Sequence, residues 1–340
     1  MFYRSDKFLP AMLLTLGLVA LNCTVHAADK NWQPKKLPWG APDLQGIWTN
    51  ATITPLERDP KVANKLVVSE AEAKTIEENE YYNKAKEEDA KPSDPNAGAF
   101  DDGNTAAGYN AFWIDPGKTL TKVNGEYHTS IVVDPESGRV PYSPKGQQGM
   151  LGFFRNFGLN GPEQRLLGER CLVGFGSTGG PPMLPVLYNN NYQIVQSEGT
   201  VAILVEMNHD VRLIRIDDKP LSDAIHPWLG DSVGHWDGNT LVVSTTKFHP
   251  QQSMRAGMKS RVYVPPGAKV TERFTRVAED EIRYEFTVED PETYTQTWKG
   301  ALGMRKTDGP IFEYACHEGN YALPGILAGA RAEEQEKAKR

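Results

Sequence analysis

The chain has 340 residues, with 37 Lys and Arg against 44 Asp and Glu and a net charge of −7. Hydrophobic residues make up 39% of it and charged residues 24%, which excludes wholesale disorder. The acidic balance argues against nucleic acid as a partner, because such binding needs an excess of Lys and Arg. The 31 Gly and 24 Pro predict many turns and favour a β architecture over a helix bundle.

Residues 1–27 have the pattern of a secretory signal peptide. Arg4 and Lys7 form a basic start, residues 8–21 are apolar, and residues 25–27 (VHA) offer small side chains at a cleavage site. The apolar run is too short for a durable membrane span, and the mature chain has no stretch suited to one. We therefore expect a periplasmic or secreted protein.

The mature chain would keep two cysteines, Cys171 and Cys316. In an oxidising compartment a pair of cysteines predicts one disulfide, with two buried thiols as the alternative. Neither cysteine has a CxxC partner, and the chain has no HExxH or HxH motif. We therefore expect no metal site, and no motif indicates a cofactor.

Residues 28–110 are expected to form an extended N-terminal arm. Residues 44–50 (LQGIWTN) suggest that the arm leads into a first strand. Ser69, with Glu72 three residues later, predicts a capping box that opens an acidic helix ending near Lys91. Residues 92–110 have little apolar content and predict a mobile loop.

Residues 111–325 are predicted to form an antiparallel β domain, followed by a charged tail over residues 326–340. Tight turns such as Asp237-Gly238 separate stretches of alternating apolar and polar residues. The pattern favours an up-and-down meander that closes into a lipocalin-like barrel, with a β-sandwich as the alternative. The expected strands are residues 128–134, 192–196, 201–207, 211–216, a pair around Asp237-Gly238, 269–277, 281–289, 293–304 and 312–316.

Two short motifs match known sites without the structural context that those sites need. Residues 174–179 match G-x-G-x-x-G, but Gly180-Pro181-Pro182 follow, so no helix can begin there to bind a pyrophosphate. Residues 230–234 match G-x-S-x-G around Ser232, where His226 or His235 would be the base. A turn formed by Asp231 and Ser232 is the favoured interpretation there.

Glu206, His209, Asp210 and Arg212 surround one predicted hairpin turn. Glu206 and Arg212 flank this turn symmetrically, so they are expected to pair across the two strands. The functional interpretation is a His209 imidazole polarised by Asp210, with Arg212 available for an anionic group. The structural alternative is a surface ion pair beside an ordinary turn.

His317 follows Cys316 directly. A disulfide at Cys316 would fix the neighbouring backbone, which suits a catalytic or binding side chain. The alternative is an ordinary loop histidine at the end of a strand.

Six segments stand out together: residues 42–48 (PDLQGIW), 169–171 (ERC), 188–196 (YNNNYQIVQ), 206–212 (EMNHDVR), 228–236 (WLGDSVGHW) and 313–320 (EYACHEGN). They resemble segments of a large group of exported bacterial proteins of unknown function. The opening Gly46-Ile47-Trp48 is similar to the Gly-x-Trp start of lipocalins. The resemblance implies no activity, but it marks residues 206–212, 230–236 and 316–320 as the regions in which to seek a site.

The favoured function is processing of a small organic molecule in an aromatic-lined barrel cavity, by metal-independent acid–base catalysis as in a lyase, isomerase or hydrolase. The expected catalytic residues are His317, His209, His235, Asp210 and Asp231, and the expected substrate contacts are Glu206, Arg212, Trp228 and Trp298. The sequence does not determine the oligomeric state.

Two functions of other classes compete with catalysis. One is a non-enzymatic, lipocalin-like binding protein for a hydrophobic ligand, and the other is an envelope interaction module that uses the acidic helix. Convergence of His209, Asp231 and His317 in one deep pocket would favour catalysis, whereas their scatter would favour binding.

Overall fold

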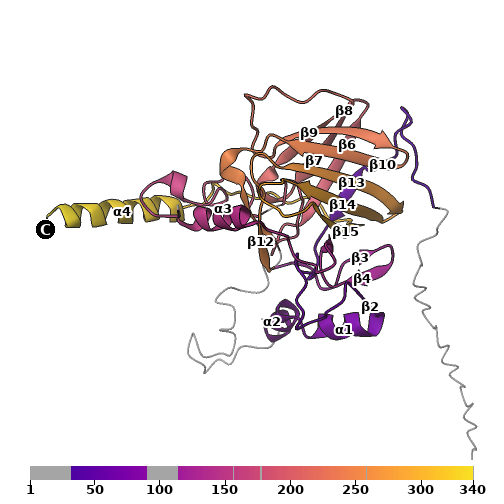
Figure 1. Ribbon diagram of the computed structural model, residues 1–340, viewed down its shortest axis with the longest axis horizontal. Helices are drawn as coiled ribbons and strands as arrows, with labels where there is room; N and C mark the ends of the chain where they lie inside the picture. Colours follow the sequence, from indigo (N-terminus) through magenta and orange to yellow (C-terminus); the bar gives the residue numbers. More distant parts are fainter. Residues whose placement is uncertain (1–31, 90–113, 156, 177, 258, 340) are drawn as a thin grey trace, which may run out of the picture.

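The structure is a computed structural model of the chain, and it describes residues 32–89, 114–155, 157–176, 178–257 and 259–339 (Figure 1). The predicted signal peptide over residues 1–27 and the predicted mobile loop over residues 92–110 lie outside the described residues.

A closed barrel of nine strands forms the centre of the molecule (Figure 1). The strands follow each other around the barrel in the order β1, β6, β7, β8, β9, β10, β13, β14 and β15, and β15 pairs with β1 to close the ring. This confirms the predicted mainly β barrel. The bounds are β1 Gly46–Thr49, β6 Asn191–Ser197, β7 Thr200–Val205, β8 Val211–Ile216, β9 Asp231–Asp237, β10 Thr240–Thr246, β13 Lys269–Ala278, β14 Glu281–Glu289 and β15 Trp298–Lys306.

One pair of neighbouring strands departs from the predicted antiparallel meander. β8 and β9 are parallel, whereas the pairs β6–β7, β7–β8 and β9–β10 around them are antiparallel. Parallel neighbours need a connection that returns along the sheet, and residues 217–230 provide it. The barrel is therefore mixed, with a crossover where the sequence pattern suggested continuous hairpins.

The N-terminal arm and the β domain share one hydrophobic core. β1 lies within the predicted arm, and its Trp48 is fully buried in the same cluster as Leu44, Tyr192 and Met304. Because β1 pairs with both β6 and β15, it closes the barrel. A short strand, β5 (Val132–Asp134), extends the sheet from β15.

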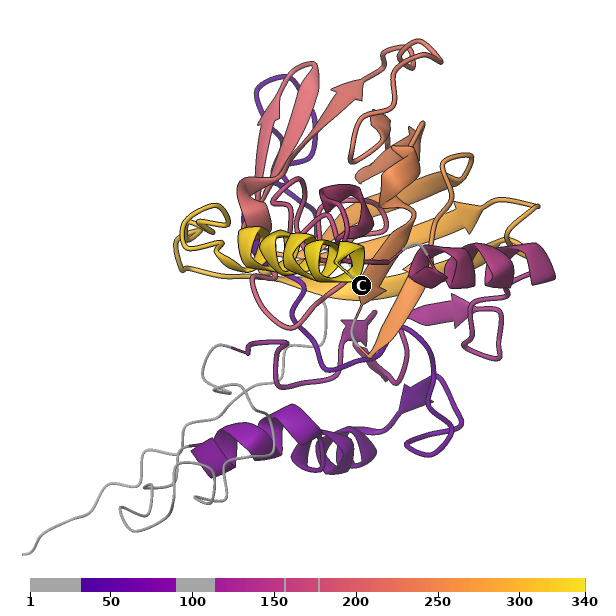
Figure 2. The same ribbon diagram turned by 90° about the vertical axis from the view of Figure 1, so that its left-hand side faces the viewer.

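Two helices, α1 (Glu70–Glu78) and α2 (Tyr81–Asp89), replace the single acidic helix that we expected (Figures 1 and 2). The capping box of Ser69 and Glu72 is confirmed. The helix ends at Asn79, and the carboxylate of the buried Glu80 accepts from the amide of Tyr82 at 2.6 Å to open the second helix. The single predicted helix is therefore two helices, and the Glu80 side chain caps the second one.

A small sheet and the first helix pack together beneath the barrel (Figure 2). The small sheet consists of β2 (Val67–Val68), β4 (Glu126–His128) and β3 (Lys122–Val123). The predicted strand over residues 128–134 is thus wrong in part. It is split between this sheet and β5, because the amides of Thr129 and Ile131 bond to Leu66 and Pro55 instead of continuing one ladder.

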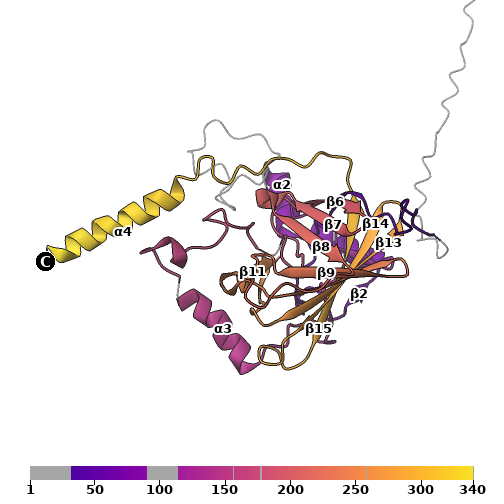
Figure 3. The ribbon, with the colours of Figure 1, turned by 90° about the horizontal axis from the view of Figure 1, so that it is seen from above.

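The remaining elements are α3 (Pro144–Arg155), the hairpin of β11 (Met254–Gly257) and β12 (Ser260–Tyr263), the 3-10 turns η2 (Pro162–Gln164), η3 (Met207–His209) and η4 (Pro250–Gln252), and α4 (Ala322–Ala338). Among these elements, α3 and β11 lie on one side of the barrel strands (Figure 3). α4 extends away from the barrel (Figures 1 and 3). The predicted strand over residues 312–316 is irregular chain instead.

Side chains fill the inside of the barrel. In β14 every second residue is buried, as the alternation predicted, and Tyr284 and Phe286 lie among these. The buried residues Met183 and Leu184 pack in the same cluster, and the Met183 amide donates to the Tyr284 hydroxyl at 2.8 Å. The aromatic side chains expected to line a cavity therefore form a solid core. No helix among the described residues is long and apolar enough to span a membrane.

Candidate functional site

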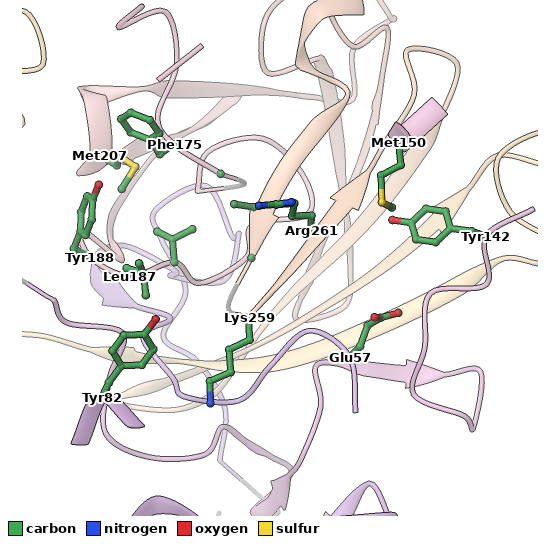
Figure 4. Close-up of a pocket in the computed structure, with 14 residues that line it drawn as sticks. Glu57, Tyr82, Tyr142, Met150, Phe175, Leu187, Tyr188, Met207, Lys259 and Arg261 are labelled. Atoms are coloured by element: carbon green, nitrogen blue, oxygen red, sulfur yellow. The ribbon is translucent and has the colours of Figure 1, made fainter. Parts of the chain in front are cut away.

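A pocket of about 760 Å³ lies beside the barrel, where segments far apart in the sequence meet (Figure 4). Its walls come from α2, α3, the hairpin β11–β12, η3 and two loop segments, residues 175–176 and 186–188. Clefts built from several separate segments, with this volume, are typical of small-molecule sites.

The side chains around the pocket are mostly apolar or aromatic. Phe175, Tyr188 and Met207 lie on one side, and Met150 and Tyr142 lie opposite them (Figure 4). Aromatic rings offer large, rigid contact area for an organic molecule, because few rotatable bonds are immobilised on binding.

Three charged side chains line the pocket: Lys259, Arg261 and Glu57. Lys259 lies in the turn between β11 and β12, where its φ is 55°, and Arg261 lies in β12. Glu57 already has partners, because its Oε1 accepts from the Val140 amide at 2.7 Å and its Oε2 lies 3.6 Å from Arg139 Nη1.

An ion pair joins the turn of the hairpin β11–β12 to the start of α2. Lys259 Nζ lies 2.7 Å from Glu80 Oε1, and the Glu80 side chain is 3% exposed. Glu80 also caps α2, whose residue Tyr82 lines the pocket. The pair therefore fixes the helix that carries Tyr82 relative to the hairpin that carries Lys259.

Hydrogen bonds to other segments hold the hairpin β11–β12 in place. The buried Arg255 of β11 donates to the carbonyl oxygen of Pro181 and, at 3.3 Å, to that of Gln252. The Tyr142 hydroxyl accepts from the amide of Tyr263 at 2.9 Å. These bonds fix the position of this wall of the pocket.

Gly176 brings the loop against this hairpin. Its φ is +75°, and a Cβ added there would lie 2.9 Å from the carbonyl oxygen of Ala256 and 2.8 Å from Val186 Cγ1. Only glycine allows this backbone to pass so closely. The motif that matched a dinucleotide site thus supplies a close-packed loop at a pocket wall.

The turn between β7 and β8 contains two left-handed non-glycine residues in succession, Asn208 (φ 62°) and His209 (φ 46°). Asp210 fixes the turn, because its carboxylate accepts from the Gly174 amide at 2.7 Å and from Asn208 Nδ2 at 3.4 Å. The bend directs Met207 into the pocket. Strained backbone of this kind is concentrated at functional sites.

Asp210 gives a test of this arrangement. Burial raises its pKa above 3.8, although the bond from Gly174 opposes the change. A carboxyl group whose pKa is raised in the folded state stabilises the fold most below its unfolded pKa, and this contribution is lost as the pH rises through the folded pKa. The free energy of unfolding of the protein, minus that of the Asp210→Asn variant, should therefore fall as the pH increases from 3.8.

Urea unfolding of both proteins between about pH 3 and pH 8 measures this difference. The exposed Asp308, replaced by Asn, is the matched control for loss of one surface charge. A difference that instead grows with pH would mean that the bond from Gly174 outweighs burial.

The residues predicted as the acid and base do not converge. His209, His235 and His317 are all exposed, and they lie in η3, in β9 and in the irregular chain after the disulfide. None of them lines the pocket, and neither do Asp210 and Asp231. Asp231 instead accepts from Arg215 Nη1 at 2.9 Å and from the Leu221 amide at 2.7 Å, which fixes the crossover.

The predicted cross-strand pair of Glu206 and Arg212 is wrong. The strand register places Arg212 opposite Ile203, so the turn is not centred where the sequence symmetry suggested. Arg212 points into the barrel and makes two hydrogen bonds to Glu272, of 3.1 and 2.6 Å. Glu206 accepts from Asn191 Nδ2 at 2.6 Å and from the Phe312 amide at 3.2 Å.

Arg212 and Glu272 form a buried ion pair, with side chains 1% and 0% exposed. Burial alone would lower the pKa of Arg212, but the adjacent carboxylate raises it above its ordinary value. Tyr284 donates to Glu272 at 2.7 Å, and Ser232 bonds both Arg212 and Thr245. Ser232 is therefore part of this buried hydrogen-bond network, and neither His226 nor His235 is one of these partners of its hydroxyl.

The two tryptophans predicted to contact substrate also lie outside the pocket lining. Trp298 is fully buried, with Phe286 and Tyr294 rings 5.6 and 5.9 Å from its own, because aromatic side chains of neighbouring strands meet inside the barrel. Trp228 lies in the crossover and stacks on His249, with ring centroids 3.8 Å apart.

The predicted disulfide between Cys171 and Cys316 is confirmed, with 5.7 Å between the Cα atoms. It joins the C-terminal segment to the loop before the pocket wall, and Asn320 adds a hydrogen bond of 2.9 Å to the Glu169 carbonyl. His317 is held next to it, as expected, but its side chain is exposed. Among the described residues, no group of three or more His, Cys, Asp or Glu side chains could hold a metal ion.

Sequence reasoning missed Tyr82, Lys259 and Arg261. Residues 259–263 (KSRVY) do not alternate between polar and apolar side chains, so no periodic pattern marked this strand. Phe175 lay inside the glycine-rich motif and Tyr188 opened one of the resembling segments, yet neither was selected as a site residue. Comparison with models of known protein families, with curated proteins and with solved structures gives no match.

Proposed function

We propose that this protein is an exported binding protein that holds a small, largely apolar organic molecule in the pocket beside its barrel. The observation that supports this proposal is the cavity of about 760 Å³, lined mostly by aromatic and aliphatic side chains. Small-molecule sites typically combine such walls with a few polar groups that orient the ligand.

Binding is favoured over acid–base catalysis because of where the ionisable residues lie. The predicted catalytic histidines, His209, His235 and His317, are exposed and outside the pocket lining. A general acid or base must reach its substrate within hydrogen-bond distance. The lining side chains can instead contact and orient a ligand.

Export is the second part of the proposal. The signal-like pattern of residues 1–27 supports it, and a disulfide between Cys171 and Cys316 is expected to persist in an oxidising compartment. N-terminal sequencing of the protein recovered from the periplasm or medium should begin at Ala28. A chain that starts at Met1 and stays in the cytoplasm would contradict export.

Filling the pocket tests the binding function. Ala256 lines the pocket from the exposed face of β11, so Ala256→Trp adds a large side chain there without removing a core contact. The neutral fluorophore N-phenyl-1-naphthylamine should bind the unmodified protein and bind the variant at least about tenfold more weakly.

Ala202→Trp is the matched control, because Ala202 lies on the outer wall of the barrel in β7 and outside the lining. Circular dichroism of both variants checks that each one folds. If the fluorophore does not bind, or if Ala256→Trp leaves its affinity unchanged, the pocket is not a ligand site.

A further inference from the structure

Two tyrosine hydroxyls face the pocket from different sides. Tyr142 precedes α3 in the chain, and Tyr82 lies in α2. In Figure 4 the Tyr142 oxygen points toward Met150, and the Tyr82 oxygen points away from α2, toward the other lining side chains. Each of the two walls therefore brings one polar atom into a mostly apolar pocket.

The Tyr142 hydroxyl is fixed by a hydrogen bond in which it is the acceptor. It accepts from the Tyr263 amide at 2.9 Å, and none of the residues that the structure describes accepts a bond from it. A hydroxyl has one donor in addition to its acceptor positions, so this proton stays available for a ligand. A hydroxyl that already accepts one bond is polarised by it and donates more strongly.

Both tyrosines remain neutral donors. Burial raises the pKa of Tyr142 and the pKa of Tyr82, so each hydroxyl keeps its proton at neutral pH. A protonated phenol can donate to a carbonyl oxygen. In apolar surroundings an acceptor on the ligand is favourable, because a donor that is left unpaired there costs free energy.

The charged side chains of the lining already have partners. Lys259 pairs with Glu80 at 2.7 Å, Glu57 lies 3.6 Å from Arg139, and Arg261 is not without a partner either. A charged ligand would compete with these partners and would lose its own hydration among apolar walls. This arrangement favours a ligand without net charge.

We propose that the ligand is a neutral carbonyl compound whose carbonyl oxygen accepts a hydrogen bond from the Tyr142 hydroxyl. This inference rests on the proposed binding function and adds the chemical class of the ligand. The apolar body of the molecule packs against Phe175 and Met207, which lie across the pocket from Tyr142 (Figure 4). One end of the ligand is thus oriented by a hydrogen bond and the other by apolar contact.

Two naphthalene derivatives of nearly equal size isolate the carbonyl oxygen. 2-Acetylnaphthalene carries it, and 2-ethylnaphthalene has a methylene group in its place. Each one competes against N-phenyl-1-naphthylamine for the protein. 2-Acetylnaphthalene should displace the probe from the unmodified protein at a concentration about fivefold lower than 2-ethylnaphthalene, and Tyr142→Phe should remove this preference.

The ratio between the two compounds separates recognition from packing. Tyr142→Phe also leaves the Tyr263 amide without its acceptor, but a resulting shift of the hairpin would affect both compounds. The exposed Tyr321 lies outside the lining, so Tyr321→Phe is the matched control for loss of one hydroxyl and should keep the preference. In the infrared spectrum, the carbonyl stretch of bound 2-acetylnaphthalene should lie at lower wavenumber in the unmodified protein than in Tyr142→Phe.

The outcomes distinguish this inference from the proposed function. If N-phenyl-1-naphthylamine does not bind, the proposed function fails and the inference falls with it. If the probe binds but 2-acetylnaphthalene displaces it no better than 2-ethylnaphthalene, or if Tyr142→Phe keeps the preference, the pocket binds apolar molecules without recognising a carbonyl group at Tyr142.

Two further measurements test the donor and the charge of the ligand. If Tyr82→Phe removes the preference and Tyr142→Phe does not, the donor lies on α2 and the assignment to Tyr142 is overturned. The anion 2-naphthoate should displace the probe only at a higher concentration than 2-acetylnaphthalene. Displacement by 2-naphthoate at a lower concentration would show that the pocket selects an acid, which overturns the neutral class.

Discussion

Replacing Arg212 by Met is expected to lower the free energy of unfolding by about 3–5 kcal/mol, because it removes one partner of a buried ion pair. The Glu272 side chain is 0% exposed and would be left without its main partner inside the barrel. Methionine is unbranched and flexible, so it can follow the path of the arginine side chain with little overpacking. The variant should unfold at a lower urea concentration with an unchanged denaturant dependence.

A second substitution separates the charge from the packing. Glu272→Gln in the Arg212→Met background removes the unpaired charge and keeps an acceptor for the Tyr284 hydroxyl, which donates to Glu272 at 2.7 Å. We expect the double variant to recover much of the lost stability, since the burial of an unpaired charge accounts for most of the cost. If the double variant is no more stable than Arg212→Met, the loss came from packing instead.

Reducing the disulfide is expected to lower the melting temperature by several degrees. The bond between Cys171 and Cys316 has a sequence separation of 145, and the chain-entropy model assigns about 4–5 kcal/mol to a loop of that size. In the unreduced protein both cysteines should resist alkylation. Thermal unfolding with and without reductant, with thiol counting, measures the effect.

The variant Cys171→Ala/Cys316→Ala is the control for this experiment. The same reductant should not change its melting temperature, because the variant has no bond to reduce. An unchanged melting temperature of the fully reduced parent protein would show that the C-terminal segment contributes little to the cooperative unit.

The sequence alone determined the features that depend on local pattern. Alternation of period two predicted the strands of the barrel, and in β14 every second residue is buried as expected. The capping box at Ser69 was predicted because its two hydrogen bonds link residues only three apart. The disulfide followed from a count of cysteines and the expected compartment, which needs no knowledge of the fold.

Only the tertiary structure decided which side chains meet. Arg212 pairs with Glu272, 60 residues away, and not with the nearby Glu206, because register and barrel closure bring β8 and β13 face to face across the core. The parallel pairing of β8 with β9 is likewise set by how the strands close into the barrel. The pocket likewise joins Tyr82, Phe175 and Arg261 from separate segments. Periodicity reports which face of an element is buried, but it carries no information about the partner, because long-range contacts are set by the packing of the whole chain.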